Sequence, residues 1–320
     1  MLDGRFSVRL SSREELTEHI TAFDLVDLEK RELPRYAAGA HIEVDVRPGL
    51  IRRYSLCGDP ADSRTYRIAV LRDPRSRGGS ATIHENWKPD EVITISTPRN
   101  NFALLSAPAS IVLFAGGIGI TPILSMAYEL AQQERTFAVH YAARSQSLMA
   151  FHRVFAGGRF GQNINFYFDD GSPDERFDPV RILEASPKDA HIYVCGPAGF
   201  NAAMAKAALQ AGFASRQFHL EAFSAPKPAE GEKEFTVELA STGRRVLVPA
   251  DRTIVEALDG DGVFVPSMCR QGICGMCITN VLKGDVEHRD DFLTQDERAR
   301  GNVFLPCCSR SAGGLLVLDI

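Results

Sequence analysis

Alternating apolar and polar positions mark the first third of the chain. Residues 42–46 alternate between apolar and acidic side chains, a pattern typical of a half-buried strand. Similar short runs at 67–71 and 91–95 are separated by proline and glycine residues. Regular short strands with turn residues between them predict an antiparallel barrel or sandwich over residues 1–105.

The hydrophobic pattern changes after Pro108. A continuous apolar run at 110–114 leads into glycines and then into a helical pattern that extends through Gln132. Further buried strands are predicted at 137–141 and 191–194, and an alanine-rich helix at 200–210 follows the second. Strand, turn and helix in repetition predict parallel α/β units over residues 106–223.

A third domain is predicted at the C-terminal end. Residues 224–233 combine proline, lysine, glutamate and glycine, which is typical of an interdomain linker. Beyond the linker, residues 234–320 carry their own strand patterns at 235–239, 246–248 and 315–318. We therefore expect a multidomain protein.

Composition and charge exclude several classes of protein. The 320 residues are 44% hydrophobic and 24% charged, with a formal net charge of −5, as in an ordinary globular protein. A mildly acidic chain without a basic block argues against nucleic acid or anionic lipid as the main partner. No apolar stretch reaches the length of a membrane span, and residues 1–5 show no start of a secretory signal. We expect a cytoplasmic protein.

The seven cysteines are distributed unevenly, and five of them lie between residues 269 and 308. The odd number and the absence of an export signal argue against a disulfide framework. The spacing C-x4-C-x2-C, with a further cysteine 30 residues later, is that of plant-type ferredoxins with a [2Fe–2S] cluster: Cys269, Cys274, Cys277 and Cys307. Gly272 and Gly275 allow this loop to turn tightly around a cluster. A zinc site or incidental buried cysteines are the alternatives, although only one C-x2-C pair is present.

Two glycine-containing segments follow predicted strands of the α/β region. In the first, residues 114–122 (FAGGIGITP), glycines allow close approach of a pyrophosphate, and Thr121 and Pro122 are predicted as N-cap and first helical residue. The second segment, residues 194–199 (VCGPAG), contains Cys195. Both lie where open α/β sheets bind ligands. A tight structural turn and a buried packing thiol are the alternatives.

Four motifs in fixed order carry a family resemblance. They are R-x-Y-S-L at 52–56, GGIGITP at 116–122, CGP at 195–197 and the C-terminal cysteines. The first three occur in this order in the ferredoxin-NADP reductase superfamily. With the cysteines, the chain closely resembles the phthalate dioxygenase reductase family over nearly its whole length. The resemblance implies an antiparallel β-barrel that binds FMN, an α/β parallel-sheet NAD domain and an α+β ferredoxin-like (β-grasp) [2Fe–2S] domain.

The resemblance also implies the residues of the flavin site. Arg52 matches the arginine that holds the flavin phosphate, Tyr54 the residue against the isoalloxazine, and Ser55 the hydroxyl near flavin N5, with Leu56 completing the motif. Gly78, Gly79 and Ser80 match a second phosphate-binding turn. From the residues alone, an ordinary polar-edged strand and a plain β-turn are the alternatives.

The nucleotide and cluster residues follow in the same way. Gly117, Gly119 and Thr121 match the pyridine-nucleotide loop, and Cys195, with Gly196 and Pro197, matches the thiol near the nicotinamide. Phe223 matches the aromatic residue that shields the flavin, with simple packing as the alternative. We assign catalytic roles to Ser55, Cys195 and Phe223. Similarity to ferredoxins favours Cys307 over its neighbour Cys308 as the fourth metal ligand.

The activity that the resemblance implies is electron transfer. NADH reduces FMN, the flavin passes electrons singly to the [2Fe–2S] cluster, and the cluster delivers them to a Rieske-type oxygenase that acts on an aromatic or similar small molecule. FAD is an alternative to FMN. Arg144 follows the second predicted strand of the α/β region, where such domains recognise the 2′-phosphate of NADPH. NADPH is therefore an alternative to NADH. A cytochrome P450 as acceptor and a non-enzymatic redox sensor are the competing functions. We expect a monomer.

Overall fold

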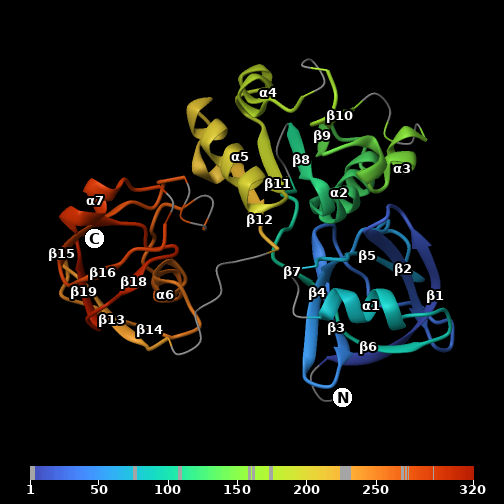
Figure 1. Cartoon of the computed structure of the whole chain (residues 1–320), viewed down its shortest axis with the longest axis horizontal. Helices are drawn as coiled ribbons and strands as arrows, with labels where there is room; N and C mark the ends of the chain where they lie inside the picture. The colour runs from blue at the N-terminus through green and yellow to red at the C-terminus, as the bar shows by residue number, and fades with distance from the viewer. Residues whose placement is uncertain are drawn as a thin grey trace. The chain divides into compact units, whose positions relative to one another are not determined.

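The computed structural model describes residues 4–74, 78–106, 110–157, 160, 163–172, 176–223, 232–267, 270, 272, 274–290 and 292–320. The chain divides into two compact units, Met1–Pro197 and Ala198–Ile320, and each is described by itself. Figure 1 shows the elements along the chain. No helix among the described residues is long and apolar enough to cross a membrane.

The first unit begins with an antiparallel sheet that curls into a nearly closed barrel. Its strand order is β4-β3-β6-β1-β2-β5, with β7 paired to β3. A bridge between Leu56, directly after β4, and Ile68 of β5 links the two edges of the sheet. The strands are β1 (Arg5–Glu15), β2 (Ile20–Asp27), β3 (Ala40–Arg47), β4 (Leu50–Ser55), β5 (Thr65–Leu71), β6 (Val92–Ser96) and β7 (Arg99–Asn100).

The alternating pattern produces the core of this barrel. In β3, Ile42 and Val44 are fully buried, whereas the residues that follow them, Glu43 and Asp45, are not. Arg5 donates to both Glu43 and Asp45, so the polar face of the sheet carries ion pairs. Helix α1 (Gly79–Asn86) was not predicted, and its buried Ile83 adds to the same apolar core.

A parallel sheet follows the barrel. Its order is β10-β9-β8-β11-β12, and the first four strands pair in parallel. All six residues of β8 are buried, as the continuous apolar run predicted. The elements are β8 (Ile111–Gly116), α2 (Ile120–Gln132), β9 (Phe137–Ala143), α3 (His152–Ala156), β10 (Ile164–Phe168), α4 (Pro179–Ala185), β11 (His191–Cys195), α5 (Ala198–Gln210) and β12 (Phe218–Glu221).

The predicted start of α2 was wrong by two residues. The helix begins at Ile120 with Gly119 as its N-cap, so Thr121 and Pro122 are the second and third helical residues. A short 3₁₀ turn, Gly117–Gly119, extends the helical path backwards, and the Thr121 hydroxyl donates to the Ile118 carbonyl at 3.1 Å. Thr121 is therefore engaged with the preceding turn and does not cap the helix.

The C-terminal unit contains a mixed sheet of order β14-β13-β19-β15-β17 and a small ladder β16-β18. β19 lies in the middle of the sheet, parallel to β13 and antiparallel to β15. The elements are β13 (Phe235–Leu239), β14 (Arg245–Val248), α6 (Ile254–Gly260), β15 (Thr279–Lys283), β16 (Val286–Glu287), α7 (Gln295–Arg300), β17 (Val303–Phe304), β18 (Arg310–Ser311) and β19 (Leu315–Leu318). The predicted fold class is confirmed.

The last two residues of the predicted linker, Glu232 and Lys233, pack into this unit. Glu232 forms ion pairs with Arg289 and, at 3.0 Å, with Arg310, and its side chain is only 6% exposed. Arg310 also donates to the carbonyls of Arg252, Lys233 and Pro249. Residues 224–231 of the linker lie outside the described residues.

His140 on β9 leads to a pH-dependent stability. Its ring stacks on Phe114 with centroids 5.0 Å apart, and Nδ1 lies 2.8 Å from the Tyr167 hydroxyl. Burial lowers the pKa of His140 to about 4. The unfolded chain, with a His pKa of about 6.5, therefore binds a proton between about pH 6.5 and 4 that the folded chain does not, so stability is lost as the pH falls through this window.

We expect the free energy of unfolding to be lower at pH 5 than at pH 7 by about 2 kcal/mol from this residue alone. Urea unfolding followed by circular dichroism at the two pH values measures the difference. His140→Phe removes the titrating group and keeps an aromatic ring, so it should reduce the difference by that amount. An unchanged difference in the variant would contradict the assignment.

Candidate functional site

The barrel brings two of the predicted phosphate-binding segments together. Arg52 lies on β4, and Gly78 precedes α1 in a left-handed conformation, with φ 87°. A Cβ atom on Gly79 would lie 2.8 Å from Nε of Arg52, so the guanidinium passes directly over the first turn of the helix. A cationic side chain beside a helix N-terminus is an arrangement that binds phosphate.

The remainder of the R-x-Y-S-L segment runs from a partly buried to a buried environment. Tyr54 is partly buried, and burial raises the pKa of its hydroxyl to about 12, opposed by the charge of Arg52. Ser55 is 5% exposed and Leu56 is fully buried. An uncharged aromatic ring and a hydroxyl thus follow the arginine along one strand, as a flat heterocycle with a phosphate tail requires.

The two glycine-containing segments of the α/β domain meet at the carboxyl ends of two neighbouring strands. β8 and β11 are neighbours, with Ala115 in register with Cys195. A Cβ atom on Gly119 would overlap the carbonyl group of Cys195 and would lie 2.7 Å from the Gly196 nitrogen. Glycine at 119 is therefore required by this close approach, since its φ of −61° suits any residue.

Other predicted nucleotide-site residues occupy distinct environments. Cys195 is fully buried, Thr121 is 2% exposed, and Gly196 is buried, whereas Pro197 is exposed. Gly117 has a φ of +53° and its carbonyl accepts from the Tyr141 hydroxyl at 3.2 Å. Phe223, after β12, is 48% exposed.

Three of the four predicted cluster ligands are described and buried: Cys274, Cys277 and Cys307. Cys307 forms side-chain hydrogen bonds with Cys277 and with Cys308, and these contacts, together with burial, raise the pKa of the Cys307 thiol. Metal binding to this group therefore releases protons. Cys269 lies outside the described residues, and no three His, Cys, Asp or Glu side chains among those described form a metal-binding group by themselves.

Two described glycines of the predicted cluster loop adopt conformations that favour glycine. Gly272 and Gly275 have φ of +73° and +72°, which favour glycine over any other residue. A Cβ atom on Gly275 would overlap the ring of Phe292. Buried thiols that contact one another, beside a glycine-rich cradle, form a donor set suited to a [2Fe–2S] cluster. The residues present fit this group.

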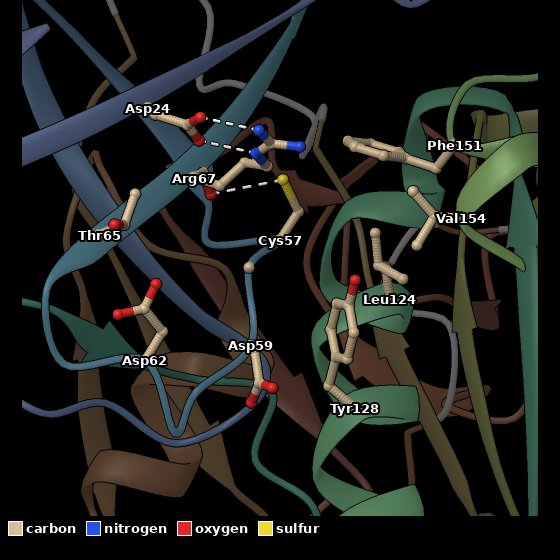
Figure 2. A pocket seen from close by; sticks show the side chains of 11 residues that line it. Asp24, Cys57, Asp59, Asp62, Thr65, Arg67, Leu124, Tyr128, Phe151 and Val154 are labelled. Carbon is tan, nitrogen blue, oxygen red and sulfur yellow. Dashed lines mark hydrogen bonds and ion pairs between the residues drawn. The ribbon is translucent and has the colours of Figure 1, made fainter. Parts of the chain in front are cut away.

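The remaining cysteines have structural explanations. The Cys308 sulfur lies 3.6 Å from the Leu305 carbonyl and 3.8 Å from the Ser309 hydroxyl. The Cys57 thiol donates to the Arg67 carbonyl at 3.3 Å, and burial raises its pKa, so it is an unreactive thiol. Figure 2 shows Cys57 lining a pocket of about 280 Å³, beside the Asp24–Arg67 ion pair and opposite Leu124 and Phe151.

Known proteins resemble the chain over its full length. A model of the "2Fe-2S iron-sulfur cluster binding domain" matches residues 237–312. Vanillate O-demethylase oxidoreductase of Pseudomonas sp. (strain HR199 / DSM 7063) is 42% identical over 98% of this chain and 99% of its own. The solved structure of phthalate dioxygenase reductase is 36% identical, with a TM-score of 0.65. The match covers 99% of this chain and 98% of that chain. The chain belongs to the phthalate dioxygenase reductase family.

A further solved structure places the same modules in a longer chain. An intact type IV self-sufficient cytochrome P450 monooxygenase is 36% identical with a TM-score of 0.67, over 99% of this chain and 41% of the P450. As a member of the phthalate dioxygenase reductase family, this chain is an NAD(P)H-dependent flavin iron–sulfur oxidoreductase, the reductase component of an oxygenase system.

The sequence missed two features of these sites. One is α1, whose first turn lies under Arg52. The other is a polar turn of residues 288–290 and 292–294, whose buried Asp290 packs against Gly272 of the cluster loop. For α1, the usable signal was a glycine, Gly78, that can precede a helix, followed by a stretch without proline up to Pro89. The polar turn had none, because its residues become neighbours of the loop only in the folded unit.

Proposed function

We propose that this chain is the NADH-dependent reductase of a two-component Rieske-type oxygenase that hydroxylates or demethylates an aromatic or similar small substrate. One observation carries the proposal: the end-to-end similarity to vanillate O-demethylase oxidoreductase, at 42% identity. The sequence also supports the proposal, because the flavin, nucleotide and cluster motifs all occur in this one chain. We further propose FMN as the flavin, a cytoplasmic location and a monomeric state.

The flavin-site residues act by binding and orientation. Arg52 would neutralise the FMN phosphate, and backbone N–H groups at Gly78, Gly79 and Ser80 would donate to it. Tyr54 would lie against the ring system and the Ser55 hydroxyl near N5, while Leu56, fully buried in the barrel core, would hold the segment in place. A bound flavin accepts two electrons as hydride and releases them one at a time.

The nucleotide-site residues bring the nicotinamide to the flavin. The backbone N–H groups of Gly117 and Gly119, in the 3₁₀ turn, and of Thr121, in the first turn of α2, would donate to the pyrophosphate. Cys195, with Gly196 and Pro197, would line the nicotinamide position, and Phe223 would be the aromatic residue that shields the flavin. No acid–base pair is needed, since hydride transfer requires alignment of the donor and acceptor rings.

The ferredoxin-like domain delivers single electrons to the partner. Cys269, Cys274, Cys277 and Cys307 hold the cluster, which transfers one electron at a time. Residues 234–320 carry 13 acidic and 9 basic side chains, a net charge of −4 before the cluster is counted. Complementary charge guides redox partners together, so we infer a basic docking surface on the oxygenase.

A cytochrome P450 is the second candidate acceptor. The self-sufficient P450 monooxygenase described above contains a segment similar to this whole chain. This similarity favours a haem acceptor as the alternative to a Rieske centre.

Spectroscopy of the purified protein tests the proposal. We expect flavin bands together with broad thiolate–iron absorption, and anaerobic addition of NADH should bleach both. A colourless zinc protein would overturn the proposal. Incubating the reductase with NADH and either a Rieske oxygenase or a P450 of the same genome distinguishes the two acceptors by the rate at which each is reduced.

A further inference from the structure

Gly272 of the cluster loop packs against a polar turn that no sequence motif identified. We call the described residues 288–290 and 292–294 the Asp290 turn; Thr294 is the N-cap residue of α7. A Cβ atom on Gly272 would lie 2.5 Å from the Cys308 sulfur and 3.0 Å from Cα of Asp290. Gly272, between the predicted ligands Cys269 and Cys274 in the sequence, thus packs closely against both Cys308 and Asp290 and leaves no room for a side chain.

The Asp290 carboxylate is fully buried, with a side-chain exposure of 0%. One oxygen, Oδ2, accepts from the Leu293 backbone N–H at 2.8 Å and lies 3.5 Å from Nη2 of Arg298. The other, Oδ1, lies 3.5 Å from Nδ1 of His288. Oδ1 of Asp290, Nδ1 of His288 and Nε of Arg298 are buried without a hydrogen-bond partner of their own among the described residues.

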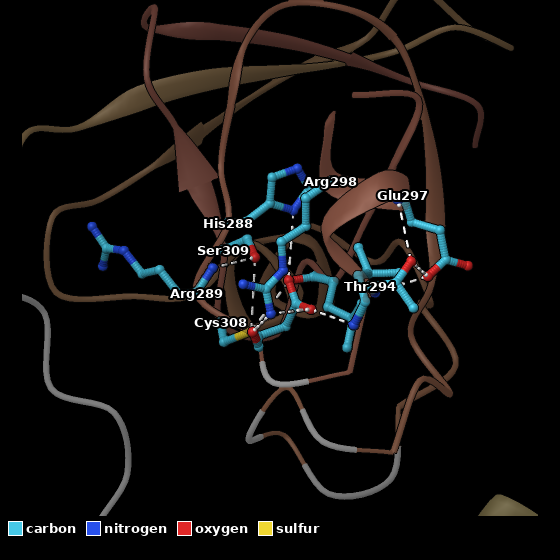
Figure 3. Close-up of polar contacts among 10 residues, drawn as sticks. His288, Arg289, Thr294, Glu297, Arg298, Cys308 and Ser309 are labelled. Atoms are coloured by element: carbon cyan, nitrogen blue, oxygen red, sulfur yellow. Dashed lines mark hydrogen bonds and ion pairs between the residues drawn. The ribbon is translucent and has the colours of Figure 1, made fainter. Parts of the chain in front are cut away.

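A buried carboxylate with an incomplete set of partners is costly, because an ion loses its hydration on burial. The turn is nevertheless built to hold it. Thr294 and Glu297 form a capping box at the start of α7, with Glu297 accepting from the Thr294 backbone N–H at 2.9 Å. The first turn of α7 then places Arg298, which also donates to the Asp290 carbonyl. Figure 3 shows His288 and Arg298 among the polar contacts of this turn.

The turn is tied to the segment that carries the last predicted ligand. The backbone N–H of Arg289 donates to the Ser309 hydroxyl at 3.2 Å, and the Ser309 hydroxyl lies 3.8 Å from the Cys308 sulfur. Cys308 in turn contacts Cys307. The Asp290 turn therefore joins Gly272 to residues 307–309. The predicted ligands lie in these two parts of the chain, which must be held at a constant separation for four thiolates to bind one cluster.

We propose that Asp290 is a positioning residue of the [2Fe–2S] site: its buried carboxylate shapes the turn that holds Gly272 against Cys308, and its negative charge, balanced only in part by Arg298, acts on the cluster. This inference deepens the proposed function and rests on the cluster being present. Asp290 does not bind iron. It acts through the loop and through the electrostatic field that the cluster experiences.

Asp290→Asn tests the proposal, because the amide keeps the shape and one acceptor oxygen but removes the charge. Asp296→Asn is the matched control: it removes the same charge from α7, six residues away, where the side chain is exposed. The two holoproteins are compared by iron content per chain, by the visible circular dichroism and electron paramagnetic resonance of the cluster, and by the midpoint potential measured with dithionite and mediators.

We expect Asp290→Asn to alter the cluster spectra and to move the potential to a more positive value, because loss of a nearby negative charge favours the reduced cluster. About a tenfold change in the ratio of oxidised to reduced cluster corresponds to 59 mV for one electron. Asp296→Asn should leave spectra and potential unchanged. Identical spectra and potentials in the two variants would overturn the proposal.

A second variant covers the case in which Asp290→Asn loses its cluster. Arg298→Lys keeps the positive charge but cannot place a planar guanidinium between the Asp290 carboxylate and carbonyl. We expect an intact cluster with altered spectra in this variant, and spectra equal to wild type would count against the proposal. Since chemical reductants are used throughout, failure of NADH to reduce the cluster would challenge the proposed function and leave this inference standing.

Discussion

Replacing Cys274 with serine should abolish reduction of cytochrome c by NADH while leaving reduction of ferricyanide in place. Cys274 is buried in the loop whose glycines turn it around the cluster position, and a serine hydroxyl is a poor ligand for iron–sulfur clusters. Changing even an outer partner of a metal ligand costs roughly 10- to 100-fold, so loss of a ligand should reduce the cytochrome c rate by more than about 100-fold. Stopped-flow absorbance and steady-state assays with the two acceptors measure the effect.

Ferricyanide distinguishes loss of the cluster from loss of the enzyme, because a small oxidant can take electrons from the flavin directly. Cys57→Ser is the control for replacing a buried thiol: the hydroxyl can still donate to the Arg67 carbonyl, and both activities should remain. If Cys274→Ser lost both activities equally, the cluster and flavin modules could not be separate electron carriers.

Replacing Gly119 with alanine should slow reduction of the flavin by NADH by about 100-fold, the size of effect that a displacement of about 1 Å causes at a reacting centre. The new methyl group would overlap the Cys195 carbonyl, so the two glycine-containing segments could not keep their present separation. Flavin content should stay at the wild-type level, because Arg52 and α1 are on the barrel. Anaerobic stopped-flow measurement at 450 nm, the absorbance of oxidised flavin, gives the rate.

Gly157→Ala provides the matched control in the same domain. Gly157 has a φ of −70°, close to that of Gly119, but a Cβ atom there would lie 3.5 Å from its nearest neighbours, an ordinary contact. Flavin reduction in this variant should equal that of wild type. A Gly119→Ala enzyme that was reduced equally fast would show that the close approach to Cys195 has no part in nucleotide binding.

Hydrophobic periodicity was sufficient to predict the fold class and the strands that it marks strongly. The runs at 235–239 and 315–318 became β13 and β19 with the same bounds. β15, with only two apolar residues of five, was not predicted, and β10 was missed although four of its five residues are apolar or aromatic. The start of α2 was wrong because a threonine before a proline resembles an N-cap, whereas the 3₁₀ turn at 117–119 had already begun the helical path.

The candidate site was predictable where chemistry fixes the spacing of residues along the chain. Four thiolates around one cluster and glycines at a strand end are patterns of this kind. The close approach of Arg52 to Gly79 and the burial of Asp290 against Gly272 each join segments more than 15 residues apart. No local sequence pattern could have predicted these two contacts. The assignments of individual residues to flavin and nucleotide stay predictions until ligands are observed.

The central position of β19 in its sheet has a consequence for biosynthesis. Every other strand of that sheet precedes β19 in the chain, yet β13 and β15 are joined only through it. On the ribosome, all the cysteines that we assign to the cluster are therefore synthesised before the strand that completes the sheet around them. Since domains fold as units, iron and sulfide can be held stably only after Leu315–Leu318 has left the exit tunnel. Until then the nascent thiols are open to oxidation.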